Sequence, residues 1–204
     1  PVAGASIKVG SNPTGVYRCG GTDRGNDSGC GDSDTRAPAA RSVVEICMMD
    51  EKDFAATFDV SRETMDALSL YYKLLVKWNN SINLVAKSTL GDAWRRHFVD
   101  SAQLWSLAPA RARSWVDIGS GGGFPGMVVA ILAAEQRPDM VVTLVESDQR
   151  KATFLGAVAR ELGLSPQILA VRAELHPPLG ADVLSARALA SLDKLLEYTE
   201  RHLA

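Results

Sequence analysis

Residues 115–126, WVDIGSGGGFPG, place a carboxylate and a cluster of glycines directly after a short run with the character of a strand. Gly119, Gly121 and Gly123 can adopt positive φ and, because they lack a Cβ, they let the main chain approach a bound molecule closely. In open parallel sheets, ligands bind beyond the carboxyl ends of the strands, where a turn leads into a helix. The stretch therefore predicts a ligand-binding loop.

Two kinds of ligand use such a loop. A dinucleotide presents a pyrophosphate to the helix end, and GGGFPG formally satisfies the GxGxxG pattern. Counted from Gly119, the first glycine after the strand, Phe124 occupies the third glycine position of that pattern. Asp117 precedes the loop, and its carboxylate would repel a pyrophosphate but suits a ligand with an amine or a cation. S-adenosylmethionine fits this description, and an NAD-dependent oxidoreductase is the alternative.

A second carboxylate, Glu146, ends the next β-branched run, VVTLVES. An acidic side chain at this distance beyond the glycines accepts hydrogen bonds from ribose hydroxyls in nucleotide-binding sheets. The adenosine of either ligand would use it. No Lys followed by Ser or Thr comes after the glycines, which excludes a phosphate-cradling P-loop. The structural alternatives are a solvated loop carboxylate for Asp117 and a helix-capping group for Glu146.

The elements that position these residues alternate in type. Four short runs have strand character, at 115–119, 141–147, 168–174 and 181–188. Segments with helical spacing separate the first three, at 126–136 and 149–163. This alternation predicts right-handed crossovers in a parallel sheet, so the fold class is α/β, doubly wound. Because only four strands precede the last residue, we expect a sheet truncated at the C-terminus.

Upstream of the sheet the pattern is helical. Ser61 can cap a helix over DVSRETMDALSLYYKLLVKW, and a second helix is predicted near 90–107. The apolar face of the first is expected at Met65, Leu68, Tyr72, Leu75 and Val76. The chain is thus predicted to comprise a leader over 1–47, a helical unit over 48–110 and an incomplete ligand-binding α/β domain over 111–204.

Residues 1–47 are rich in Gly, Ser, Asp and Thr, a composition that cannot offset the entropy of ordering, and we expect a disordered or non-native leader. Cys19, Cys30 and Cys47 all lie there without the spacing of a disulfide framework or a zinc site, so no metal is expected.

The overall charge and hydropathy limit the possible partners. The formal net charge is −2, so any nucleic acid must be bound by a local basic patch. No apolar run approaches the roughly 18 to 20 residues needed to span a bilayer, so we expect no membrane partner and a cytoplasmic location.

Five segments between about residue 60 and residue 204 together resemble the RsmG (GidB) family. The segments are KWNNSINLVA, RRHFVDSAQL, DIGSGGGFPG, RAE and SARALASLDKLLE, in this order. The resemblance implies a Rossmann-like class I methyltransferase fold that uses S-adenosylmethionine to methylate N7 of a guanine in small-subunit (16S) ribosomal RNA. The implied partner is this RNA or its ribonucleoprotein precursor. The family's C-terminal strands are absent here, and residues 1–47 match nothing in it.

The resemblance also implies which residues meet the cofactor. They are Gly119 and Phe124 in the loop, Ala173 and Glu174 after the third strand, and Arg187 after the fourth. Together with Asp117, Gly121, Gly123 and Glu146 they form the predicted cofactor site. Guanine N7 carries no proton, so methylation needs no general base, and Arg187 is the candidate catalytic residue as a donor to O6 or a phosphate. The structural alternative for Arg187 is an ion pair with Asp182 or Asp193. For the protein as a whole, the alternative function is that of a non-catalytic relative that binds a nucleoside or RNA.

The segment WRRHFVDS carries the densest basic cluster of the predicted helical unit. Arg95, Arg96 and His97 are the candidate RNA-binding residues. A local ion pair between Arg96 and Asp100, four residues apart on a helix, is the alternative.

Overall fold

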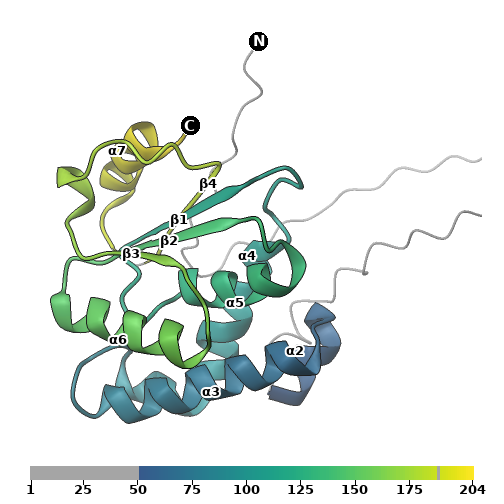
Figure 1. Ribbon diagram of the computed structural model, residues 1–204. Helices are drawn as coiled ribbons and strands as arrows, with labels where there is room; N and C mark the ends of the chain where they lie inside the picture. The colour runs from purple at the N-terminus through teal and green to yellow at the C-terminus, as the bar shows by residue number, and fades with distance from the viewer. Residues whose placement is uncertain (1–50, 188) are drawn as a thin grey trace, which may run out of the picture.

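The computed structural model describes residues 51–187 and 189–204. Its strands form one parallel sheet in the order β3-β2-β1-β4 (Figure 1). The strands are β1 (Ser114–Ile118), β2 (Val141–Val145), β3 (Gln167–Leu169) and β4 (Val183–Ala186). This topology confirms the α/β prediction. The predicted leader and its three cysteines lie outside the described residues.

Helices cover both faces of the sheet. α5 (Gly126–Gln136) connects β1 to β2, α6 (Gln149–Glu161) connects β2 to β3, and α7 (Leu192–His202) follows β4. In Figure 1, α7 lies on the opposite side of the sheet from α5 and α6. The doubly wound arrangement predicted from the alternation is therefore present.

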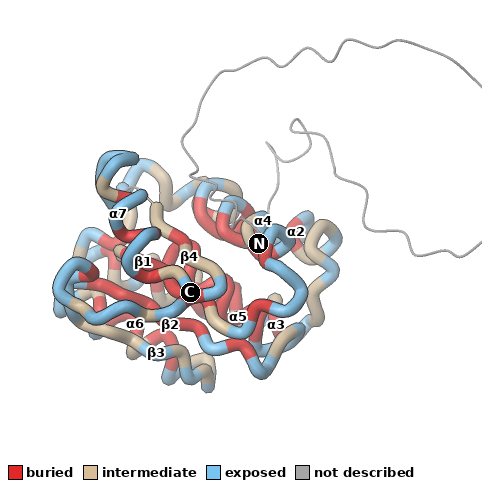
Figure 2. The backbone as a smooth tube through the Cα atoms, turned by 90° about the horizontal axis from the view of Figure 1, so that it is seen from above, coloured by how far each residue is buried: buried red, intermediate tan, exposed pale blue. Residues whose placement is uncertain are grey.

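Alternate residues of β1 serve the two faces, as the pleat of a strand requires. Trp115 packs in the core shared with α5, whereas Val116 and Ile118 pack in a second core with Leu195 and Tyr198 of α7. The first two turns of α5 are buried on every side because its sequence is apolar all round. Figure 2 shows these buried segments running through the middle of the molecule.

The N-terminal part contains α2 (Glu51–Phe58), which was not predicted, and α3 (Arg62–Asn79), which was. The predicted cap is confirmed, since the side chain of Ser61 accepts a hydrogen bond from Thr64 N at 3.1 Å. The fully buried aromatic of α3 is Tyr71, whereas Tyr72, which was predicted to face the core, is only partly buried.

The predicted second helix is divided in three. A 3₁₀ segment, η1 (Lys87–Asp92), and a π-helical segment, η2 (Trp94–Val99), precede α4 (Asp100–Trp105). The three successive residues His97, Phe98 and Val99 are all buried in η2. Wide turns of this kind are frequent at functional sites.

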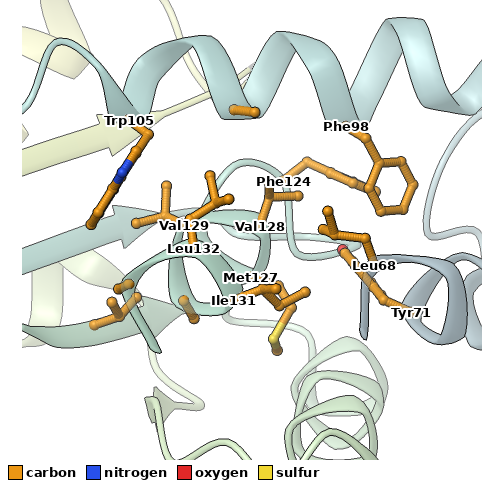
Figure 3. Close-up of a cluster of buried hydrophobic side chains, with 14 of the residues drawn as sticks. Leu68, Tyr71, Phe98, Trp105, Phe124, Met127, Val128, Val129, Ile131 and Leu132 are labelled. Carbon is orange, nitrogen blue, oxygen red and sulfur yellow. The ribbon is translucent and has the colours of Figure 1, made fainter. Parts of the chain in front are cut away.

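The N-terminal helices and the sheet-covering helices share one hydrophobic core. Figure 3 shows Leu68, Tyr71 and Phe98 meeting Phe124 and the apolar side chains of α5. Among the helices that the structure describes, none has the length and apolar character needed to cross a membrane.

Candidate functional site

The candidate residues follow the four strands at the same edge of the sheet. Gly119 follows β1, Glu146 follows β2, Ala173 and Glu174 come after β3, and Arg187 follows β4. Because the strand order is β3-β2-β1-β4, they form one row in which Glu146 and the glycine loop lie between the Ala–Glu pair and Arg187. The structure brings Gly121 into contact with Glu146 and Phe124 into contact with Arg187. Ala173 and Glu174 instead contact His202 and Tyr198 of α7.

The glycine loop depends on left-handed backbone conformations. The φ angles are 71° at Gly119, 56° at Gly121 and 96° at Gly123. A Cβ at Gly123 would also lie 2.5 Å from the hydroxyl oxygen of Tyr71, whereas a Cβ at Gly121 would meet only the carbonyl oxygen of Gly119, at 3.8 Å. The loop is therefore tightly packed at Gly123 and open at Gly121.

Asp117 supports this loop from inside the protein. Its side chain is fully buried and accepts hydrogen bonds from Ser185 Oγ at 2.7 Å and from Gly126 N at 3.1 Å. Burial raises the pKa of Asp117, while these hydrogen bonds and the charge of Arg187 act in the opposite direction. Because the side chain of Asp117 has no exposed surface and its donors are internal, the structure gives no support to the expected direct pairing of Asp117 with a cationic ligand.

Glu146 links the loop to the turn after β2. One carboxylate oxygen accepts a hydrogen bond from Gly121 N and the other from Asp148 N, both at 2.7 Å. The side-chain cap of α6 is Asp148, which accepts from Arg150 N at 2.8 Å, so Glu146 does not have the capping role given as its structural alternative. Each oxygen of Glu146 has a second lone pair that can accept from a hydroxyl group.

Phe124 ends the loop within an aromatic cluster. Its ring stacks on Tyr71 with centroids 5.3 Å apart and on His97 with centroids 5.0 Å apart, and it meets Phe98 edge-on. The hydroxyl group of Tyr71 donates to the carbonyl oxygen of Gly122, and burial raises the pKa of Tyr71 well above its usual value. The cluster fixes the loop on α3 and η2 (Figure 3).

Arg187 reaches from the end of β4 to η2. Its Nη1 contacts Arg96 O at 3.3 Å, His97 Nδ1 at 3.2 Å and Asp100 Oδ2 at 3.5 Å. The guanidinium carbon lies 5.3 Å from the centroid of Phe124. Arg187 therefore pairs with Asp100, and not with Asp182 or Asp193 as the structural alternative supposed.

The basic cluster divides into exposed and buried parts. Arg95 and Arg96 both pair with Asp92, and the side chain of Arg96 is 54% exposed. The local partner of Arg96 is therefore Asp92, not Asp100. His97 is only 9% exposed and its ring nitrogens contact Arg187 and Thr89, so its position does not favour the direct RNA contact that the sequence analysis expected.

After β3, Ala173 is buried and Glu174 is exposed. The carboxylate of Glu174 accepts from the hydroxyl group of Tyr198 at 3.2 Å and pairs with Arg172 at 3.6 Å. Hydrogen bonds from its own backbone N–H and from Tyr198, together with the charge of Arg172, lower the pKa of Glu174. Among the described residues, no cluster of three or more His, Cys, Asp or Glu has the arrangement of a metal site.

Sequence reasoning missed two residues that shape the site. Ser185 lies opposite Asp117 in the β1–β4 register, and its hydroxyl oxygen accepts a hydrogen bond from Trp115 Nε1 at 2.9 Å while it donates to Asp117. Tyr71 holds the carbonyl group of Gly122. The signal for Ser185 was a polar residue in an apolar strand, whereas Tyr71 could not be told from Tyr72 by spacing alone.

The model of the GidB family, described as rRNA small subunit methyltransferase G, matches residues 64–204, which contain every candidate residue. Two similar proteins are both named ribosomal RNA small subunit methyltransferase G. The one from Ruegeria sp. (strain TM1040) is 53% identical over 146 residues, which cover 72% of this chain and 71% of that protein. The one from Rhodospirillum centenum (strain ATCC 51521 / SW) is 54% identical over 151 residues, which cover 74% and 68%.

Among solved structures, the YcgJ protein of Bacillus subtilis aligns with a TM-score of 0.43 at 19% identity, over 52% of this chain and 47% of that one. This likeness is too low to carry an argument. The family match and the identity to its named members carry the assignment: the chain belongs to the GidB family of small-subunit ribosomal RNA methyltransferases.

Proposed function

We propose that this chain transfers a methyl group from S-adenosylmethionine to N7 of a guanine in small-subunit (16S) ribosomal RNA. The observation that carries the proposal is the row formed at one sheet edge by Glu146, the glycine loop and Arg187, in a chain of the GidB family. Family membership does not favour the two alternatives, an NAD-dependent oxidoreductase and a non-catalytic binding relative.

The cofactor fits this row in one direction. Glu146 would accept hydrogen bonds from the ribose hydroxyls, because it is a buried carboxylate and each of its oxygens has a second lone pair. The adenine is attached to the ribose, so it would extend toward the end of β3, at Ala173 and Glu174. The remaining part of the cofactor would then lie along the loop at Gly121, where a Cβ would meet only the carbonyl oxygen of Gly119, whereas the Leu189 side chain lies against Gly119.

When bound, S-adenosylmethionine would supply a methyl group that is already activated by the positive charge on sulfur. Guanine N7 attacks with a lone pair and has no proton to lose, so the protein needs to align the two reactants and exclude water. Arg187 lies at the β4 end of the row, where it would donate to the guanine O6 or to an RNA phosphate and hold the base in place.

The RNA backbone would be met by the exposed cations of η2. Arg96 is half exposed, and its main-chain oxygen already contacts Arg187, so a phosphate bound at Arg96 would lie close to the proposed base site. Arg95 adjoins it, although Asp92 partly neutralises both guanidinium groups. The free RNA and its ribonucleoprotein precursor both offer such phosphates.

Calorimetry tests the cofactor part of this proposal against the oxidoreductase alternative. We expect saturable binding of S-adenosylmethionine and S-adenosylhomocysteine, and no binding of NAD at comparable concentrations. Binding of NAD alone would reject the proposal. Binding of both sulfur compounds without methyl transfer to undermethylated small-subunit RNA would favour the non-catalytic relative.

A further inference from the structure

The contact between His97 and Arg187 joins two segments that are distant in the sequence. Arg187 Nη1 lies 3.2 Å from His97 Nδ1, and the other ring nitrogen, Nε2, lies 2.9 Å from Thr89 Oγ1. Thr89 Oγ1 in turn donates to the carbonyl oxygen of Ala86 at 2.7 Å. The three contacts form a continuous chain from the end of β4 to the start of η1.

The chemistry of the partners decides the direction of every hydrogen bond in this chain. A guanidinium group has only donors, so Nδ1 of His97 must be the acceptor and carries no proton. The single ring proton is then on Nε2, which donates a hydrogen bond to Thr89 Oγ1. The hydroxyl group of Thr89 in turn donates to the carbonyl oxygen of Ala86. The lowered pKa of His97, about 4, agrees with a neutral ring, and burial and the charge of Arg187 are its main causes.

The same two side chains also share an aromatic platform. The His97 ring is nearly parallel to that of Phe124, at an interplanar angle of 29°, and the guanidinium group of Arg187 lies over the same Phe124 ring. An arginine side chain loses considerable rotamer entropy when it is held in one place, so a fixed guanidinium group needs several contacts. His97 supplies one of these contacts from a buried ring.

We propose that His97 is a positioning residue. By accepting a hydrogen bond from Nη1, it fixes the orientation of Arg187 toward the RNA substrate. The inference deepens the proposed function and rests on it. Within the described residues, the hydrogen bonds of Arg187 all come from Nη1. The edge formed by Nε and Nη2 therefore keeps the bidentate geometry that suits a phosphate, or one donor for the guanine O6.

Two substitutions at His97 separate this role from simple packing. In His97→Asn, the side-chain oxygen can take the place of Nδ1 and accept from Arg187, but the shorter side chain loses Thr89. In His97→Gln, the amide can take the place of Nε2 and keep Thr89, but Arg187 loses its acceptor. A positioning role predicts that the Asn variant stays within about threefold of the wild-type kcat and that the Gln variant loses about 10- to 100-fold.

The melting temperatures of the two variants should be similar, because each variant keeps one of the two ring contacts of His97. A purely structural residue would make kcat and melting temperature fall together, and that result would overturn the proposal. Wild-type kcat in the Gln variant would overturn it as well.

A readout that needs no activity keeps this test distinct from that of the proposed function. Nitrogen NMR of the arginine side chains should show restricted rotation of the Arg187 guanidinium group in the wild type and in His97→Asn. Rotation should be faster in His97→Gln, where only Arg96 O and Asp100 remain as acceptors. Free rotation in the wild type would overturn the inference. Restricted rotation in a wild-type protein that methylates no RNA would instead reject the proposed function and leave the His97–Arg187 link standing.

Discussion

Glu146 holds the glycine loop through Gly121, whose backbone N–H donates to Glu146 Oε2 at 2.7 Å. The two residues belong to the turns after neighbouring strands, so the carboxylate that is proposed to bind ribose also sets the shape of the loop beside it. Under the proposed function, ligand affinity and loop geometry would therefore depend on one side chain.

Replacing Glu146 with Gln should weaken S-adenosylmethionine binding by about 10- to 100-fold. The amide keeps one acceptor but faces either Gly121 N or Asp148 N with an NH₂ group, and it removes the charge. Calorimetry measures the dissociation constant. Glu161→Gln, at the exposed end of α6, is the control and should leave it unchanged. A dissociation constant within twofold of wild type in Glu146→Gln would contradict the assigned site.

Two helical glycines should respond oppositely to alanine. At Gly126 a Cβ would lie 2.2 Å from Leu144 Cδ2 and 2.7 Å from Asp117 Cβ, both in the core, so Gly126→Ala should cost about 1–3 kcal/mol of unfolding free energy. At Gly156 no atom lies within 4 Å, so Gly156→Ala should gain about 0.5–1 kcal/mol from helix propensity. Urea unfolding compares the two. Equal effects would show that α5 does not pack as closely on β1 as described.

His97 should make stability depend on pH. Its folded pKa of about 4 lies below the usual 6.5, so the unfolded chain binds more protons between these values. Stability contributed by the neutral ring is thus present above about pH 6.5 and is lost as the pH falls toward 4, by up to about 3 kcal/mol. The charged groups that act on the ring are Arg187, Arg96 and Asp92, and Asp100 pairs with Arg187 beside it.

Unfolding of the wild type and of His97→Asn at several pH values isolates this contribution, because the other titrating groups are common to both proteins. The wild type should lose more stability than the variant on acidification. Parallel curves between pH 4 and pH 6.5 would show that His97 is not buried as a neutral ring.

Arg96→Gln should weaken RNA binding and lower the steepness of its salt dependence by about one, if Arg96 neutralises one phosphate. Arg160→Gln removes an equal charge from an exposed position in the last turn of α6 and serves as the control. Binding titrations of small-subunit RNA over a range of salt concentrations give both slopes. Identical slopes for wild type and Arg96→Gln would remove Arg96 from the RNA interface.

Local signals in the sequence predicted much of the fold. The Ser61 cap, the alternation of strands and helices, and the glycine loop after β1 each depend on neighbouring residues, and the structure contains all three. The π-helical turn of η2 was missed because its helical spacing reads as one continuous helix, and the inward turn of His97 arises only when Phe124 is packed against it.

The sequence alone could not show which residues of distant segments contact one another. Asp100 and Asp182 are both acidic, but only the folded chain shows that Asp100 meets Arg187 while Asp182 accepts from Ser114 and Arg113. Likewise, Asp117 was expected to meet a ligand because it precedes the glycines. In the structure it is fully buried, and its hydrogen-bond partner Ser185 is distant along the chain and adjacent only in the sheet.

The most direct test of the central claim is methyl transfer to a defined base. Small-subunit particles and naked 16S RNA from cells that lack the family enzyme would be incubated with this protein and S-adenosylmethionine, and the RNA mapped by mass spectrometry. The account predicts one additional methyl group, on N7 of a single guanine, with little or none when Arg187 is replaced by Ala. RNA of unchanged mass, or a methyl group on any other atom, would contradict it.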